Sequence, residues 1–241
     1  MNLNLVKFIP PGTQRILEIG CADGSLGEHL LKQGVAQEVI GIELLPEAAA
    51  QARTKLSQVF CENAETFKLP VPEKTFDCLL YGDSLEHLHN PLALLSYHCS
   101  LLKDTGCVVC SIPNVRNLFI IDQLLHGRWT YTDWGLLDRT HFHLFTLHEI
   151  AVMFQQAGLQ IETLEFSFRP ANWFTMMYPA ENIRADFLNW YDQLQNQLSS
   201  QPDVVINALK KKYNLGKELT VQEAAEFFAV QFHLRAVKQH A

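Results

Sequence analysis

The sequence predicts an α/β protein with a doubly wound, seven-stranded and mostly parallel sheet, an antiparallel last strand and a helical insertion. Short apolar segments alternate with amphipathic segments from the start of the chain, which is typical of strand–helix–strand units. Glycine and proline stand at most boundaries between these segments. With 241 residues, 48% of them hydrophobic, the chain can bury a full core without disulfides. We therefore expect residues 1–241 to form a single domain.

The first five strands and their connecting helices follow in order. Apolar runs predict strands at 15–20, 38–43, 59–60, 76–81 and 106–112. The connecting helices are expected at 26–33, 46–57 and 91–103. Pro46 stands near the first turn of its helix, where a missing N–H does no harm. A further helix from about Leu147 to Gly158 leads into a sixth strand at 159–168.

The C-terminal part combines a strand with a long connection before it. Apolar residues alternate with mostly polar ones over 230–237, which predicts a seventh strand with one apolar face, as antiparallel strands near a sheet edge show. A connection as long as 169–219 is uncommon without structure of its own, so we expect a helical insertion there. This insertion is either a packing element, such as a homodimer contact, or a cap over a substrate.

Charge and cysteine usage exclude several classes of protein. The 19 basic and 26 acidic residues give a formal net charge of −7, which argues against nucleic acid as a partner. The six cysteines are scattered through apolar stretches, as buried thiols in a reducing compartment would be. No targeting segment and no run of 18 apolar residues is present, so we expect a cytoplasmic protein without a membrane span.

Small residues follow the first strand at Gly20, Ala22 and Gly24, where the backbone of a parallel strand's end can approach a ligand. A dinucleotide fingerprint needs glycine where Ser25 stands, so nicotinamide nucleotides are disfavoured. Glu43 ends the second strand, and a carboxylate there can accept hydrogen bonds from both hydroxyls of a ribose.

These motifs carry a family resemblance. The strings E-I-G-C-A-D-G at 18–24, G-I-E at 41–43 and F-D-C-L-L-Y-G-D-S-L-E-H-L at 76–88 resemble the class I S-adenosylmethionine-dependent methyltransferases, which have a Rossmann-like sheet. S-I-P-N-V-R-N at 111–117, G-R-W at 127–129 and G-L-L-D-R-T-H at 135–141 resemble bacterial methyltransferases of polysaccharide biosynthesis. They are also similar to proteins associated with methionine biosynthesis. The central glycine of the family's loop is replaced by Ala22.

The resemblance implies a cofactor site for S-adenosylmethionine at the ends of four strands. Glu18 and Cys21 belong to the loop motif and are expected in the cofactor site. The structural alternative for Glu18 is a buried carboxylate whose hydrogen-bond partners are backbone donors. The other implied roles are Gly20, Ala22 and Gly24 beside the methionyl part, Glu43 on the ribose, Leu44, Asn63 and Ala64 around the adenine, and Tyr81, Gly82 and Asp83 near the sulfonium.

Two histidines are candidate general bases for a hydroxyl acceptor, which has to lose its proton during attack. His141, with Asp138 as a possible orienting partner, closes the segment 127–141, a candidate lid over the cofactor. His87 follows the fourth strand. For both, a structural role in a turn or loop is the alternative. Histidine pairs two residues apart lack a completing cysteine or carboxylate pattern, so we expect no metal.

The resulting hypothesis is methyl transfer to a small polar or glycan-related acceptor at oxygen. Trp129, Tyr131 and Trp134 in the candidate lid are suited to stacking on a sugar or aromatic acceptor, although core packing also explains aromatics there. Alternatives are methylation at nitrogen, methylation of a methionine-pathway intermediate, or a non-catalytic protein that binds the cofactor.

Overall fold

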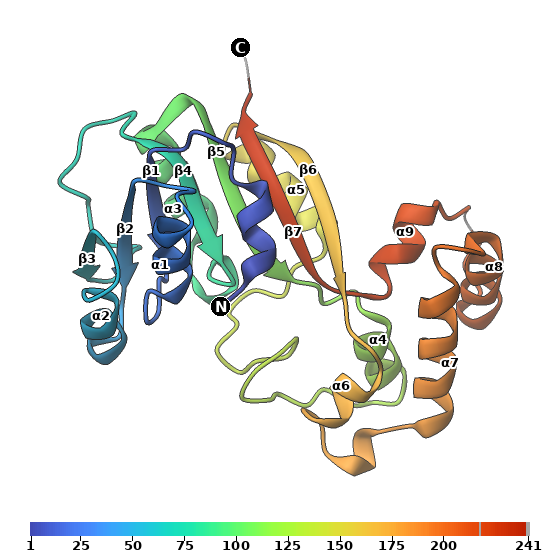
Figure 1. Cartoon of the computed structure of the whole chain (residues 1–241). Coiled ribbons are helices and arrows are strands. Elements are labelled where there is room, and N and C mark those ends of the chain that lie inside the picture. Colours follow the sequence, from blue (N-terminus) through green and yellow to red (C-terminus); the bar gives the residue numbers. More distant parts are fainter. Residues whose placement is uncertain (217, 240–241) are drawn as a thin grey trace. The chain divides into compact units, whose positions relative to one another are not determined.

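The computed structural model describes residues 1–216 and 218–239 (Figure 1). Its contacts divide the chain into two compact units. The first, here the sheet unit, comprises Met1–Ile112, His148–Glu165 and the C-terminal stretch from His233. The second, here the helical unit, comprises Pro113–Leu147 and Phe166–Phe232. Among the described residues, no helix combines the length and apolarity needed to cross a membrane.

Seven strands form one sheet in the order β3-β2-β1-β4-β5-β7-β6. Their bounds are β1 Arg15–Ile19, β2 Glu38–Glu43, β3 Gln58–Cys61, β4 Phe76–Gly82, β5 Leu102–Pro113, β6 Leu159–Phe168 and β7 Ala229–Lys238. Strands β1 to β5 pair in parallel. The predicted fold class is confirmed. The strand order reverses between β1 and β4, and ligands of such sheets bind at the carboxyl ends of the strands beside that point.

The last strand, β7, runs against its neighbours, as its alternating pattern predicts. The amide of Asn114, just after β5, donates to the carbonyl of Val230 at the start of β7. At the other end, the amide of Gln239 donates to the carbonyl of Gly158, just before β6. Figure 1 shows the β7 arrow pointing opposite to β5 and β6. The seventh strand is therefore antiparallel.

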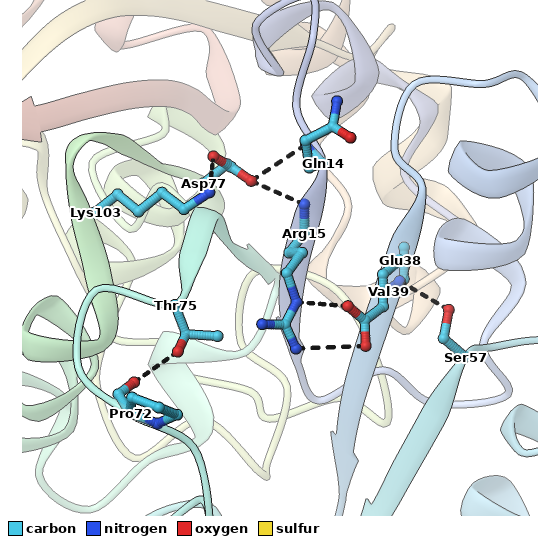
Figure 2. Close-up of polar contacts among 9 residues, drawn as sticks. All are labelled: Gln14, Arg15, Glu38, Val39, Ser57, Pro72, Thr75, Asp77 and Lys103. Carbon is cyan, nitrogen blue, oxygen red and sulfur yellow. Dashed lines mark hydrogen bonds and ion pairs between the residues drawn. The ribbon is translucent and has the colours of Figure 1, made fainter.

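Polar side chains hold the amino ends of the parallel strands in register (Figure 2). The Asp77 carboxylate on β4 accepts hydrogen bonds from the backbone amides of Gln14 and Arg15 and from Lys103 Nζ on β5. Partial burial works against ionisation of Asp77, but these donors outweigh it and hold its pKa below the ordinary value. Arg15 also pairs with Glu38 at the start of β2. The sheet is thus fixed at the edge opposite to the expected ligand crevice.

Helices of the sheet unit connect the strands. They are α1 Ser25–Lys32, α2 Pro46–Ala52, α3 Pro91–Leu101 and α5 Leu147–Gln156, with 3₁₀ turns η1 Leu3–Phe8 and η2 Leu85–His87. Two expected helices end early. Helix α2 stops at Ala52, and the chain then turns toward β2. There the Ser57 hydroxyl accepts a hydrogen bond from the Val39 amide. Helix α3 stops at Leu101 because Leu102 already pairs with Phe76 in the sheet.

The helical unit has a core of its own, built on aromatic rings. Its elements are α4 Leu118–Leu125, α6 Asn172–Thr175, η3 Ala180–Asn182, α7 Ala185–Gln197, α8 Pro202–Tyr213 and α9 Val221–Glu226. Phe119 stacks on Phe174, with ring centroids 4.2 Å apart, and Phe174 meets Tyr191 edge to face. The Asn117 amide donates to backbone carbonyls of Phe228 and Ala229 inside this core. Helices thus occupy the predicted insertion at 169–219.

Candidate functional site

The loop between β1 and α1 bends through three left-handed residues. Gly20, Ala22 and Gly24 have φ angles of 70°, 48° and 78°. Glycine adopts this conformation freely, whereas a residue with a Cβ, such as Ala22, pays about 1 kcal/mol. The amide of Ala22 donates to Glu43 Oε2 at 2.8 Å, which stabilises the bend. The small-residue motif is therefore a tight backbone turn.

Glu43 is the side chain that joins this loop to the end of β2. Its carboxylate is 8% exposed and accepts two backbone hydrogen bonds, from Ala22 to Oε2 and from Leu45 to Oε1, both at 2.8 Å. Each carboxylate oxygen has about two lone-pair positions, so each retains one acceptor position. Glu43 is thus both a brace of the loop and an acceptor pair suited to a vicinal diol.

Packing explains why two of the loop positions are glycine. A Cβ on Gly24 would lie 2.9 Å from the Cα of Ala52 in α2, so this glycine lets α1 approach α2. A Cβ on Gly20 would lie 3.2 Å from Ser84 Cβ, beyond the end of β4. Gly20 itself is exposed, and the Ser84 hydroxyl beside it is buried without a hydrogen-bond partner among the described residues. Contact of Gly20 and Gly24 with a cofactor stays a prediction.

An ion pair that the sequence did not reveal anchors the middle of the loop. Lys55 Nζ donates to Asp23 Oδ2 at 2.6 Å, and the Ser25 hydroxyl donates to the same oxygen. These two hydrogen bonds lower the pKa of Asp23 to about 2. Lys55 lies 32 residues away in the chain, beyond the end of α2, and no local pattern connects it to the loop.

Glu18 and Cys21 lie buried below the loop. Burial is the main cause that raises the pKa of Glu18 to about 8, and the charge of Asp23 adds to it, while a hydrogen bond from the Gly27 amide opposes it. Glu18 Oε2 has no hydrogen-bond partner among the described residues. Backbone donors therefore satisfy this carboxyl only in part. Burial likewise raises the pKa of the Cys21 thiol to about 12, so this cysteine is unreactive.

The end of β4 reaches the same edge of the sheet, beside β1. Tyr81 pairs in register with Ile19, and its side chain is fully buried, with its hydroxyl 2.7 Å from His98 Nδ1 of α3. The chain then turns at Asp83, which has a φ of 55° and donates its amide to the Ser111 hydroxyl. Of the residues predicted near the sulfonium, Gly82 and Asp83 are half-buried, and Tyr81 is fully buried.

The expected adenine side follows β2 and β3, whose ends pair at Glu43 and Cys61. Leu44 is 61% exposed, so its side chain can cover the face of an apolar ring. The Asn63 side chain accepts from the amide of Glu65 and so shapes its own turn, with Ala64 inside it. The strand ends therefore bring the predicted binding residues of β1, β2, β3 and β4 to one edge.

The two candidate bases belong to different units. His87 is half-buried at the end of η2 in the sheet unit, and His141 is half-buried in the helical unit. The His141 amide donates to the carbonyl of Asp138, and Asp138 Oδ1 accepts from the amide and hydroxyl of Thr140. These bonds fit the structural alternative, a hydrogen-bonded turn in the candidate lid. Catalysis by either histidine stays a prediction.

Known proteins similar to this chain are methyltransferases or share their fold. Residues 3–164 match the family described as methyltransferase domain. The ubiquinone biosynthesis O-methyltransferase of Cereibacter sphaeroides is 28% identical, over 66% of this chain and 66% of that protein. This chain thus matches about two thirds of the length of that relative.

Solved structures extend the likeness to nearly the whole chain. A SAM-dependent methyltransferase from Archaeoglobus fulgidus superimposes with a TM-score of 0.61 at 18% identity, covering 98% of this chain and 90% of that one. The [4+2]-cyclase SpnF superimposes with a TM-score of 0.59 at 17% identity, covering 99% of this chain and 79% of that one. At these identities the likeness concerns the fold.

Proposed function

Since the chain belongs to the methyltransferase-domain family, we propose that it transfers the methyl group of S-adenosylmethionine to a hydroxyl oxygen of a small polar or glycan-related acceptor. The observation that supports this most is the braced carboxylate of Glu43 beside the left-handed turn of Gly20 to Gly24. It offers two acceptors for a ribose at the switch point of the sheet, where ligands of such folds bind. The name of the Cereibacter relative supports oxygen as the methylated atom.

The residues present fit the proposed cofactor. The exposed backbone of Gly20 allows close approach, Glu43 retains acceptor positions, and the exposed Leu44 offers an apolar face. When bound, S-adenosylmethionine supplies a methyl group already activated on a sulfonium. The protein then has to hold the acceptor oxygen in line behind that carbon, which is worth about 7–11 kcal/mol of the barrier.

The protein also has to take a proton from the acceptor hydroxyl. A placed general base contributes roughly 10²- to 10⁴-fold in rate. His141 and His87 are the candidates, and the segment 127–141 is the candidate lid that excludes water. The aromatic side chains of Trp129, Tyr131 and Trp134 are 37%, 51% and 46% exposed, so their faces can stack on an acceptor ring.

A second candidate function is cofactor binding without methyl transfer. It is favoured by the likeness to SpnF, whose name is that of a cyclase although its fold is the same. Methyl transfer is preferred here because the family match covers the four strand ends that form the candidate site.

Calorimetry with S-adenosylmethionine and S-adenosylhomocysteine tests the proposal, followed by transfer assays on hydroxyl and amine acceptors. We expect both ligands to bind, and the variant Glu43→Gln to bind about 5- to 100-fold more weakly, because an amide loses one acceptor toward the ribose. Glu47→Gln, at an exposed position of α2, is the matched control and should bind normally.

Absence of binding to the wild-type protein would refute the proposal. Binding without transfer to any acceptor would favour the second candidate. Transfer to amines alone would correct the methylated atom to nitrogen. An unchanged affinity of Glu43→Gln would remove Glu43 from the ribose site.

A further inference from the structure

A buried hydrogen bond links α3 to the end of β4. Tyr81 Oη lies 2.7 Å from His98 Nδ1, and both side chains are 0% exposed. The surrounding core is apolar on both elements: Leu79 and Leu80 precede Tyr81, and Leu94, Leu95 and Leu101 share α3 with His98. Burying polar groups in such a place costs free energy unless they are hydrogen-bonded, and here each side chain is the other's partner.

His98 is held in its neutral form. Burial is the main cause that lowers its pKa to about 3, and the nearby Lys68 ammonium lowers it further. Burial also raises the pKa of the Tyr81 phenol well above its ordinary value, so the pair remains a neutral hydrogen bond across the physiological pH range. His98 Nε2 has no partner among the described residues. The imidazole therefore binds Tyr81 at the cost of one buried polar atom left unsatisfied.

The position of Tyr81 shows what this bond can control. Tyr81 is the penultimate residue of β4, two residues before Asp83 adopts a left-handed conformation. Its ring fixes the strand on the α3 side, while the amide of Asp83 is fixed on the β5 side by the Ser111 hydroxyl at 3.0 Å. The bend at Gly82 and Asp83 is thus held from two sides, next to the Gly20 loop that β1 brings to the same edge.

We propose that His98 is a positioning residue: through its hydrogen bond to the Tyr81 hydroxyl it sets the backbone of Gly82 and Asp83 in the geometry that receives the methionyl end of the cofactor. His98 itself touches no ligand. The inference rests on the proposed function, since it assigns the purpose of the bend to cofactor binding.

The test compares Tyr81→Phe with wild type in the full-length chain. This variant keeps the ring and removes only the hydroxyl. The probe is S-adenosylhomocysteine in calorimetry, and we expect its dissociation constant to rise about three- to tenfold, the range for one neutral hydrogen bond. His98→Leu should weaken binding by a similar factor, and the double variant should be no weaker than either single one, because both remove the same bond. His98→Asn, whose amide can replace Nδ1, should restore most of the affinity.

Tyr97→Phe is the matched control. Tyr97 is the neighbour of His98 on α3 and its hydroxyl accepts from the Leu69 amide, remote from the bend in sequence. We expect this variant to bind the probe with an unchanged dissociation constant, whatever the shift in its melting temperature. A second readout needs no ligand: amide hydrogen exchange of the peptide 80–84 should quicken in Tyr81→Phe and stay unchanged in Tyr97→Phe.

The outcomes separate the two proposals. If wild type binds the probe and Tyr81→Phe binds it equally well, the positioning role is refuted while the proposed function stands. If wild type does not bind the probe, the proposed function fails and the cofactor role of His98 fails with it. In that case faster exchange at 80–84 still identifies the bond as the support of the bend, and unchanged exchange refutes that as well.

Discussion

Glu18 carries a buried carboxyl whose charge should affect folding stability. Its pKa in the folded protein, about 8, lies above the ordinary value of 4.5. Between these two values the folded state holds a proton that the unfolded state releases, so stability falls as pH rises through this window. Below about 4.5 the penalty is absent, and above about 8 it is complete, on the order of 3–5 kcal/mol.

Glu18→Gln carries no charge at any pH and should escape this penalty. In urea unfolding at a series of pH values from 5 to 9, the free energy of unfolding of the variant should increase relative to that of wild type as the pH rises. Glu47→Gln, at an exposed position, controls for the loss of one formal charge. Parallel pH profiles of Glu18→Gln and wild type would mean that Glu18 is ionised in the folded protein.

Helix α1 has a left-handed glycine at each end, and the two differ in their surroundings. Gly24 precedes it with a φ of 78° and faces the backbone of Ala52, whereas Gly34 follows it with a φ of 68° and has open space around it. Alanine at either position meets the same backbone strain, about 1 kcal/mol. Only at position 24 does it also collide with α2.

The free energy of unfolding of Gly24→Ala and Gly34→Ala should therefore differ. We expect Gly34→Ala to lose about 1 kcal/mol and Gly24→Ala to lose about 1–3 kcal/mol more, the usual range for overpacking. Urea denaturation of both variants measures the difference. Equal losses would show that α2 yields to the added methyl group without cost.

For the whole molecule, the tryptophans provide a test of the single-domain prediction. All four, Trp129, Trp134, Trp173 and Trp190, lie in the helical unit. Tryptophan fluorescence therefore follows that unit alone, whereas far-ultraviolet circular dichroism follows both. If the chain unfolds as one domain, the two signals should give the same midpoint. Gly24→Ala, which lies in the sheet unit, should then shift the fluorescence midpoint by as much as the circular dichroism midpoint. Separate midpoints would show two domains.

The sequence predicted the sheet well because its signals are local. The run 38–43 is mostly apolar, and apolar residues alternate with polar ones over 159–168; both segments have clear boundaries, and both are strands at those residues. The helices predicted at 46–57 and 91–103 were too long, because residues at their ends interact with the sheet. The Ser57 side chain bonds to β2, and Leu102 belongs to β5. Tertiary pairing of this kind does not show in the helix or strand propensity of the local sequence.

The candidate site was predictable only where its residues directly follow the ends of strands. The sequence pointed to the small residues after β1 and to the carboxylate at the end of β2, and the structure shows a left-handed turn there that is held by Glu43. Lys55 and His98 could not be found in this way, because neither belongs to a strand-end motif: each reaches its partner through a side chain that lies on a helix or in the turn after one. The roles of these residues toward ligands remain predictions.

The doubly anchored carboxylate of Glu43 has a thermodynamic consequence. Two backbone amides already hold the Glu43 side chain in one rotamer, so binding of a diol would restrict none of its torsions further. Binding would therefore avoid the entropy loss of about 0.5–1.5 kcal/mol that usually accompanies the ordering of one flexible side chain. The Glu43 side chain thus becomes ordered when the protein folds, not when the ligand binds.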